Sequence, residues 1–311
     1  MLAIIGASGK LGNATLTALL KHNLIPSSDI ICLSSSGSGT QKLQSQGVTV
    51  RSASFDTPSN LESALRGCDR LFLVSSPRIA KDFNNAPPGA GREADHFVAI
   101  DAARRAGVKH IYYSSLAFAN PSKAGVMQAH MRTEAYLAKL NKEEGLQYTV
   151  IREGLYNESW PLYFGHYDVG GDDRTEVPVG GDGRISWTSI ADLGLANALV
   201  LAADPKEWEG RTFYLSNTQD PRSLEEVAKM VGKAKGREIA LRVVSREQHE
   251  RYYVEERKMP EPMIKWWSTT YDALRDNECE IKDTTLETLL ASKGVTPKPV
   301  EETIKEMIAA A

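Results

Sequence analysis

Residues 1–12 read MLAIIGASGKLG, and apolar residues at helical spacing follow them. Residues 2–5 form a short apolar run that is typical of a buried strand, and glycines stand at positions 6, 9 and 12. This order predicts a strand, a tight turn and a helix. In such a turn Gly6 permits the chain to reverse, Gly9 leaves room for a pyrophosphate, and Gly12 lets the helix pack close to the strand.

The turn is also a candidate phosphate site, because the first N–H groups of a helix are unpaired and carry a partial positive charge. A glycine triplet between a strand and a helix is the context in which a dinucleotide motif is expected. We therefore predict that the cofactor contacts Gly6, Ser8, Gly9, Lys10, Leu11 and Gly12. The alternative is an ordinary turn between a strand and a helix, without a ligand.

The composition indicates an ordinary globular protein, long enough for one large α/β domain with an added lobe or for two domains. Of its 311 residues, 25% are charged and 41% are hydrophobic. The formal net charge is −3, from 37 basic and 40 acidic residues, and no long basic stripe is present. Binding to the phosphate backbone of nucleic acid therefore has no electrostatic support.

Cysteine usage and hydropathy narrow the cellular compartment in which the protein is expected. Cys32, Cys68 and Cys279 are widely spaced and lack zinc-ligand spacing, so we predict neither a disulfide framework nor a metal site. This usage fits a reducing compartment. The first residues are assigned to a strand rather than to a signal peptide, and no apolar run approaches the roughly 18 residues of a membrane span. We expect a cytoplasmic monomer or homodimer that binds neither membranes nor nucleic acid.

The first half of the chain alternates apolar strands with helical patterns. Further strands are expected at residues 29–33, 48–52, 70–74, 110–113 and 147–151, with helices at 61–65, 93–106 and 128–140. This rhythm predicts a Rossmann-type, doubly wound parallel sheet of the α/β class, with right-handed crossovers. Ligands of such sheets bind at the carboxyl ends of the strands, so the residues that follow each strand are the candidates for a site.

The rhythm loosens after about Tyr156, which predicts a smaller, partly discontinuous α+β lobe that binds the substrate. We assign residues 1–155 to a dinucleotide-binding domain, to which 185–203 return, and residues 156–311 mainly to the lobe. Residues 168–183 are expected to form loops or a hairpin, 185–188, 212–215 and 240–244 short strands, and 190–203, 223–231 and 299–310 helices.

Serines follow the second strand, at the point where an acidic residue usually binds the ribose 2′-hydroxyl of NAD. Residues 34–38 read SSSGS and contain no carboxylate that would repel a 2′-phosphate. Ser34 and Ser35, with Lys10 or Lys42 as a nearby charge, therefore favour NADP(H) over NAD(H), although no arginine is in place. The alternative is a flexible serine-glycine loop without a cofactor contact.

The ends of other strands complete the expected cofactor cleft. Asp56 follows the third strand, where it is placed either to bond the adenine amino group or to cap the next helix. Ser75 and Ser76 end the fourth strand and are expected on the adenosine-ribose side of the cleft. Ser114 ends the fifth strand and is expected near the nicotinamide.

A set of short motifs runs along nearly the whole chain. It comprises the glycine turn at 6–12, GVKHIYY at 107–113, HMRTE at 130–134, YTVIR at 148–152 followed by Gly154-Leu-Tyr156, ISWT at 185–188 with Ala191-Asp192, and PEP at 260–262 followed by YDA at 271–273. Together these motifs resemble the NmrA-like branch of the atypical short-chain dehydrogenases. The resemblance implies a nicotinamide cofactor, with Gly154 beside it, and a flat aromatic acceptor such as a quinone.

The chain departs from ordinary short-chain dehydrogenases in the helix after the fifth strand. Those enzymes carry Tyr-x-x-x-Lys, in which the Tyr donates a proton and the Lys lowers its pKa, and no such pair occurs here. His130 stands about where the pair is expected, and a histidine is able to bond a ribose hydroxyl or relay a proton. We take His130 as a catalytic candidate, the alternative being a structural histidine. Thr133 and Glu134 are assigned to helix stabilisation or domain linking.

Aromatic residues past the sixth strand are candidates for a substrate slot, because aromatic side chains stack well on flat rings. Tyr156, which is also a catalytic candidate, and Trp160 are the first choices. The wider set is Phe118, Tyr163, Phe164, Trp266 and Trp267. The alternative for each of them is a place in the core. A quinone takes up hydride readily, so the main task of the protein is to place the nicotinamide against it in a water-poor slot.

Two functions follow from these residues. The first is an NADPH-dependent reductase that transfers hydride to a quinone or a related aromatic or polyketide-type ketone. The alternative is a non-catalytic NAD(P)-binding redox sensor that regulates a protein partner, in line with the missing Tyr-x-x-x-Lys pair. The aromatic residues favour the reductase, because a sensor has less need of a slot for a small aromatic substrate. An epimerase or dehydratase usually needs the missing Tyr-Lys pair and is not expected.

Overall fold

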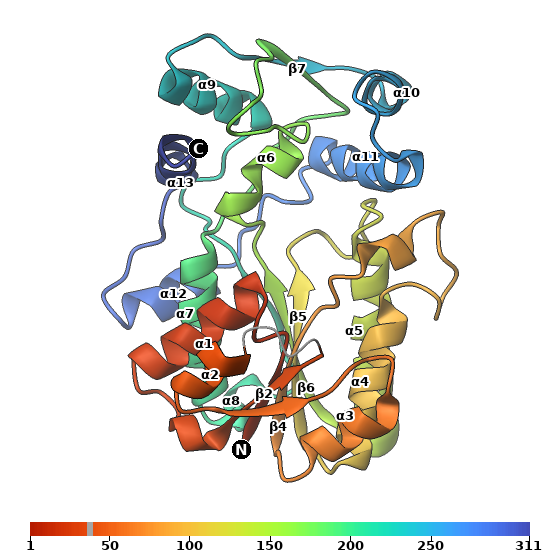
Figure 1. The fold of residues 1–311 in the computed structure, drawn as a ribbon, viewed down its shortest axis with the longest axis vertical. Coiled ribbons are helices and arrows are strands. Elements are labelled where there is room, and N and C mark those ends of the chain that lie inside the picture. Colours follow the sequence, from red (N-terminus) through yellow and green to blue (C-terminus); the bar gives the residue numbers. More distant parts are fainter. Residues whose placement is uncertain (36–39) are drawn as a thin grey trace.

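Seven strands form one parallel sheet in the order β3-β2-β1-β4-β5-β6-β8 (Figure 1). The computed structural model describes residues 1–35 and 40–311, without the side chains of Thr40 and Lys42. The strands are β1 Leu2–Ile5, β2 Ile30–Ser34, β3 Thr49–Ser52, β4 Arg70–Val74, β5 His110–Leu116, β6 Gln147–Glu153 and β8 Thr212–Leu215. β1 and β2 are buried along their whole length, which explains why they are apolar runs without alternation.

Helices cover both faces of this sheet (Figure 1). One face carries α1 Lys10–Lys21, α2 Thr40–Ser45, α7 Ile190–Ala202 and α12 Thr285–Ala291, with the short α8 Pro205–Trp208 nearby. The other face carries α3 Pro58–Leu65, α4 Glu93–Arg105 and α5 Met127–Glu144. The predicted doubly wound, Rossmann-type α/β sheet is therefore confirmed.

The chain leaves the large domain after β6 and returns to it twice. α7 packs against α1 so closely that a Cβ at Gly194 would lie 2.6 Å from the carbonyl carbon of Ala14. β8 then pairs with β6 and forms the edge of the sheet. The later α12 packs on the same side, with Leu286 and Leu290 in the core shared with α1 and α7.

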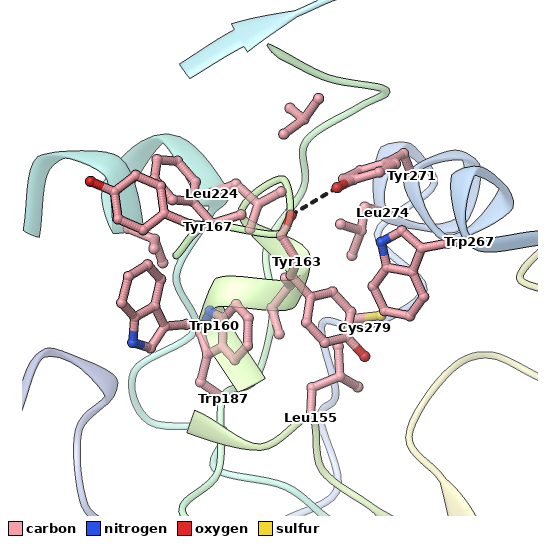
Figure 2. Packing of buried hydrophobic residues seen from close by; sticks show 14 of the residues in the cluster. Leu155, Trp160, Tyr163, Tyr167, Trp187, Leu224, Trp267, Tyr271, Leu274 and Cys279 are labelled. Carbon is pink, nitrogen blue, oxygen red and sulfur yellow. Dashed lines mark hydrogen bonds between the residues drawn. The ribbon is translucent and has the colours of Figure 1, made fainter. Parts of the chain in front are cut away.

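The smaller lobe lies beyond the carboxyl ends of the strands, at the top of Figure 1. Its elements are α6 Trp160–Tyr163, β7 Glu176–Val179, α9 Leu224–Lys235, β9 Ala240–Val243, α10 Arg246–Arg251, α11 Glu261–Arg275 and α13 Val300–Ala309. Its core is rich in aromatic rings, among them Trp160, Tyr163, Tyr167 and Trp187 (Figure 2). The lobe therefore has a hydrophobic core of its own, separate from the two cores that flank the large sheet.

Two predictions about the lobe were wrong. Residues 168–183 contain β7, which pairs in parallel with the distant β9 and forms no hairpin. Residues 185–188 form isolated bridges instead of a strand, Ile185 with Arg222 and Thr188 with Tyr156. Both pairings join segments that are distant in sequence, so local alternation of side chains did not reveal them.

Two absences hold for the described ranges 1–35 and 40–311. No helix there is long and apolar enough to cross a bilayer. No group of three or more His, Cys, Asp or Glu side chains there is arranged to hold a metal ion. Cys32, Cys68 and Cys279 are free thiols and are buried. The cytoplasmic location and the oligomeric state stay predictions.

Candidate active site: two adjoining cavities

The first cavity lies at the carboxyl ends of β1, β2 and β4 and has a volume of about 430 Å³. Nine of the predicted cofactor residues line it: Gly6, Ser8, Gly9, Lys10, Leu11, Ser34, Ser35, Ser75 and Ser76. The sequence predicted each of them from its place directly after a strand. The structure therefore brings the strand-end residues together at one edge of the sheet, where doubly wound proteins bind their ligands.

The glycine turn has the geometry that an approaching phosphate requires. Gly6 has a φ of +89°, which L side chains rarely adopt, and its carbonyl accepts a hydrogen bond from the Gly9 N–H at 2.9 Å. A Cβ at Gly9 would meet only the Gly6 oxygen, at 3.3 Å, so the remaining space above Gly9 is open to a ligand. The first turn of α1 contains no acidic side chain that would compete for its free N–H groups.

Gly12 does not line the cavity but is needed for the turn to exist. A Cβ at this position would collide with the Gly6 carbonyl oxygen and lie 2.7 Å from its carbon. Gly12 is buried in α1, where it permits close packing of the helix on the turn. Its predicted role in helix packing fits this geometry, whereas direct contact with a cofactor does not.

The wall near the end of β2 is polar and carries no carboxylate among its described residues. Ser34 Oγ is buried and has no hydrogen-bond partner in the described part of the chain, so it is available to a ligand hydroxyl or phosphate. Lys10 supplies a positive charge to the same cavity. Residues 36–38 and the side chain of Lys42, which the sequence also suggested, lie outside what the structure describes. The donors that are present fit a dinucleotide phosphate.

Asp56 is placed differently from both predictions. It does not line the cavity, and the guanidinium of Arg78 binds its two carboxylate oxygens at 2.7 and 2.6 Å. That hydrogen bond, above all, lowers the pKa of Asp56 to about 2. Thr57, not Asp56, is the residue before α3, and its side chain makes no capping bond. The neighbouring Phe55 lines the cavity instead.

A second cavity of about 240 Å³ lies between the ends of β5 and β6 and the smaller lobe. Three residues, Ser75, Arg92 and Tyr156, line both cavities, so the two adjoin. The other residues that line the second cavity are Ile79, Ser114, Ser115, Leu116, Val126, His130, Glu153, Gly154, Leu155, Ser159, Leu162, Tyr163, His166, Met263, Trp266 and Trp267. Most of this wall is apolar or aromatic, as is usual for small-molecule sites.

Eight residues that the sequence suggested for the cofactor, the chemistry or the substrate line this second cavity: Ser75, Ser114, His130, Gly154, Tyr156, Tyr163, Trp266 and Trp267. Ser114 Oγ accepts a hydrogen bond from the Ser75 N–H at 3.0 Å and so ties the ends of β4 and β5 together. Gly154 has no room for a side chain, because a Cβ would collide with the Thr188 hydroxyl. The residues expected on the nicotinamide side are thus gathered in the wall of the second cavity, and Tyr156 also reaches the first.

Three predicted substrate-binding residues do not reach the cavity. Phe118, Trp160 and Phe164 are fully buried and belong to the core of the smaller lobe. Trp160 packs against Tyr167, with ring centroids 5.7 Å apart (Figure 2). The three predictions are therefore corrected: these rings pack behind the wall, and Tyr163 and Trp267 lie in the wall itself.

His130 is 3% exposed and hydrogen-bonds through Nδ1 to the hydroxyl of Tyr113, at 2.9 Å. Burial, followed by the positive charge of Arg92 and the neighbouring ring of His96, lowers its pKa well below the usual range. Its imidazole is therefore neutral at physiological pH. A neutral imidazole is able to donate or accept one hydrogen bond at the cavity wall.

Tyr156 is a neutral phenol at the junction of the cavities. Burial, with Glu153 and Glu158 nearby, raises its pKa above the ordinary value of 10.0. Among the described residues no lysine contributes to that pKa, in contrast to the Tyr-Lys pair of ordinary short-chain dehydrogenases. Tyr156 is thus suited to contact and orientation rather than to easy proton release.

Sequence reasoning missed Arg92, Glu153 and His166. Arg92 is buried in the wall common to both cavities and pairs with Asp82 at 2.6 Å. Burial raises the pKa of Glu153 to about 8, and one of its oxygens accepts a bond from the Asn197 amide at 3.0 Å. Only Glu153 had a visible signal, since it is an acid at the end of the sixth strand.

Glu134 holds two motif segments together rather than taking part in chemistry. Its carboxylate accepts hydrogen bonds from Arg152 at 2.7 Å and from Ser115 at 2.6 Å. Asn120 Nδ2 donates to it as well, at 3.0 Å. The structural role that the sequence suggested for Glu134 agrees with these contacts.

The fold and the two cavities define a Rossmann-type protein with a dinucleotide-type site and a second, adjoining site for a small molecule. The model of the NmrA-like family matches residues 1–296. An NmrA-like family domain-containing oxidoreductase of Aspergillus flavus is 31% identical over 78% of this chain and 74% of its own length. Quinone oxidoreductase 2 of Escherichia coli is also 31% identical, over 79% of this chain and 78% of its own.

Solved structures give the same relationship. The NADPH complex of the Escherichia coli quinone oxidoreductase has a TM-score of 0.81 at 27% identity and covers 99% of both chains. Triphenylmethane reductase of Citrobacter sp. with NADP(H) has a TM-score of 0.80 at 27% identity, over 99% of this chain and 100% of that one. The chain belongs to the NmrA-like family, which confirms the prediction from its motifs, and it is an oxidoreductase of that family.

Proposed function

We propose that this oxidoreductase uses NADPH to reduce a quinone or a related aromatic ketone. The observation that carries the proposal is the contact between the two cavities through Ser75, Arg92 and Tyr156. A dinucleotide in the first cavity and a flat ring in the second would meet there. The relatives support this proposal, since one is named a quinone oxidoreductase and both solved relatives were crystallised with NADPH or NADP(H).

The residues of the first cavity are suited to hold the cofactor. The open space at Gly9 and the free N–H groups of α1 accept the pyrophosphate. Ser34 and Ser35 provide hydroxyls, and Lys10 a positive charge, in a wall without a described carboxylate, which supports NADP(H) over NAD(H). The chemistry that bound NADPH supplies is a hydride to the acceptor.

The residues of the second cavity are suited to hold the acceptor and to keep water away. Tyr163, Trp266 and Trp267 are each less than 10% exposed and present aromatic surface to a flat ring. His130 is the polar group that we assign to the acceptor oxygen, which gains negative charge as the ring takes up hydride. The acceptor then needs one proton, which solvent supplies, to complete its two-electron reduction, while the neutral His130 donates only a hydrogen bond.

The apolar second cavity also bears on the alternative of a redox sensor. A sensor that only reads the NADPH/NADP ratio needs the first cavity and a surface for its partner. Such a sensor does not need an apolar cavity beside the end of the first cavity where we place the nicotinamide. The structure thus supports the reductase over the sensor.

The experiment is an assay of the purified chain with NADPH against simple quinones, triphenylmethane dyes and polyketide-type aromatic ketones. We expect NADPH oxidation with at least the quinones, and weaker activity with NADH. Binding of NADPH without turnover of any acceptor would overturn the reductase proposal and favour the redox sensor. Equal kcat/KM for NADH and NADPH would overturn the cofactor preference alone.

A further inference from the structure

Beneath the second cavity lies a chain of buried polar side chains that links α4, β5 and α5. Its members are His96, Tyr113, His130 and Thr133, each no more than 3% exposed. The sequence suggested a site role for His130 alone and gave no sign that the four side chains form one group. Buried polar groups usually have defined hydrogen-bond partners, so the proton positions in this chain follow from its contacts.

The first link fixes the tautomer of His96. The backbone N–H of Ser76 donates to His96 Nε2 at 2.8 Å, so this nitrogen carries no hydrogen. Burial, then the charges of Arg92 and Lys81, lowers the pKa of His96 to about 3, and the ring is neutral. A neutral imidazole has one N–H, which must therefore lie on Nδ1.

The second link fixes the hydroxyl of Tyr113. His96 Nδ1 donates to Thr133 Oγ1 at 2.8 Å, and Thr133 passes its own hydrogen to the carbonyl of Ala129 at 2.7 Å. The Tyr113 hydroxyl lies 3.3 Å from His96 Nδ1, which is a donor and cannot accept from it. The other ring nitrogen beside this hydroxyl is His130 Nδ1, at 2.9 Å, and the Thr133 hydroxyl, which also interacts with Tyr113, is already engaged with His96 and Ala129.

The third link reaches the cavity. Burial raises the pKa of Tyr113 above its usual value, so its hydroxyl keeps its hydrogen. With Tyr113 as the donor, His130 Nδ1 is the acceptor, and the hydrogen of the neutral ring lies on Nε2. No hydrogen bond to His130 Nε2 is present in the described residues, and His130 lines the second cavity.

We propose that Tyr113 and His96 are positioning residues, which hold His130 in the Nε2–H tautomer so that it offers a hydrogen-bond donor to the acceptor oxygen. This inference rests on the proposed reductase function. A preorganised donor in a water-poor cavity stabilises negative charge that develops on oxygen, and it does so without having to reorient during the reaction. Tyr113, Arg92 and His96 are titratable groups that face His130, and the positive charge of Arg92 disfavours its protonation.

The direct test is the tautomeric state of each histidine by NMR of the full chain labelled with 15N-histidine. We expect His130 as the Nε2–H tautomer and His96 as the Nδ1–H tautomer across pH 6–8, with signals assigned by loss in H130Q and H96Q. The Nδ1–H tautomer at His130, or a protonated ring at pH 7, would overturn the inference. This measurement needs no turnover, so it stands apart from the test of the reductase itself.

The kinetic test is Tyr113→Phe, which removes the hydroxyl and keeps the ring. We expect kcat for a quinone to fall about fivefold, the size of one neutral hydrogen bond, with KM for NADPH unchanged and the Nδ1–H tautomer of His130 appearing in NMR. Tyr112→Phe is the matched control, because Tyr112 points to the opposite face of β5 and packs in the core beside α1. Its kcat should equal that of the wild type.

The outcomes distinguish a failure of the positioning role of Tyr113 from a failure of the proposed reductase function. An unchanged kcat in Y113F beside an active wild type would overturn the positioning role and leave the reductase intact. A wild type that reduces no acceptor would overturn the reductase and the catalytic use of the donor together. A fivefold loss in both Y113F and Y112F would also overturn the inference, because it would point to general damage at β5.

Discussion

The two cavities share part of a wall but are built from different kinds of chain. The first is made largely of backbone and small residues that follow β1, β2 and β4. The second takes side chains from β5, β6, α5, α6 and α11. These elements are distant in sequence and meet only because the lobe packs on the large domain. A site made by one local turn can therefore be predicted from the sequence, whereas a site made by packing of distant segments can be predicted only in part.

The largest expected effect comes from Gly9→Val. We expect a loss of NADPH affinity of about 100-fold or more, because the valine would fill the open space above the turn. The fold should survive, since a Cβ at Gly9 makes only one close approach and its φ of −78° suits any residue. Titration calorimetry and the melting temperature measure the two quantities.

Gly12→Val is the matched comparison for that variant. Its Cβ would collide with the Gly6 carbonyl, so we expect loss of the fold rather than selective loss of binding. Normal NADPH affinity in a folded G9V protein would show that the cofactor does not bind in the first cavity.

The next effect is expected from His130→Ala. Without a polar group at the acceptor oxygen, kcat should fall about 10- to 100-fold, while the melting temperature falls by only a few degrees. Steady-state kinetics with a quinone measure the first quantity. His22→Ala, far from both cavities at the end of α1, is the control. Unaltered kcat in H130A would make His130 a structural residue.

A pair of tryptophans separates wall from core in the second cavity. Trp266 lines the cavity, whereas Trp160 is fully buried behind it. We expect Trp266→Leu to raise the acceptor KM about tenfold with KM for NADPH unchanged. Trp160→Leu should instead lower the free energy of unfolding by the order of 3 kcal/mol and leave the acceptor KM unchanged. The reverse pattern would show that the cavity does not hold the acceptor.

The smallest expected effect is on the pH dependence of stability, and it comes from the buried carboxyl of Glu153. Its pKa rises from 4.5 to about 8 in the folded chain because of burial, so the folded state keeps a proton that the unfolded state loses above pH 4.5. The wild type should therefore lose stability as the pH rises from about 4.5 to about 8. Glu153→Gln removes this loss and still accepts the bond from Asn197.

We thus expect the melting temperature of E153Q to exceed that of the wild type by several degrees at pH 8 and by little at pH 5. Glu143→Gln on exposed α5 is the control, because its carboxylate is 54% exposed and should show no such trend. An equal gain at both pH values would mean that Glu153 is already ionised in the folded protein.

Much of the first cavity was predictable, because most of its residues lie at or just after the end of a strand with a clear apolar pattern. Ser75 and Ser76 needed only the end of β4 and the rule that parallel strands end at one edge. Asp56 failed that rule because Arg78, which follows β4, the next strand along the chain, binds its carboxylate. A side chain with a long-range ion pair cannot be placed from its own segment alone.

The second cavity was predicted by type of residue but not by position. Aromatic residues past β6 were expected to line it, yet Trp160 and Phe164 turned into the core while Tyr163 reached the wall. Neighbours in a short helix such as α6 point in different directions, and only packing decides which of them faces a cavity. Arg92 and His166 had no local pattern that would have indicated a site.

The sequence by itself determined the parallel sheet, the glycine turn and the family, because these depend on local periodicity and on backbone freedom at Gly6 and Gly12. The tertiary structure alone decided which aromatic rings line the second cavity and which group lies against Nδ1 of His130. Those features depend on contacts among α4, β5, α5 and the lobe. Burial and hydrogen bonding between distant segments set them, and a local sequence pattern holds no record of either.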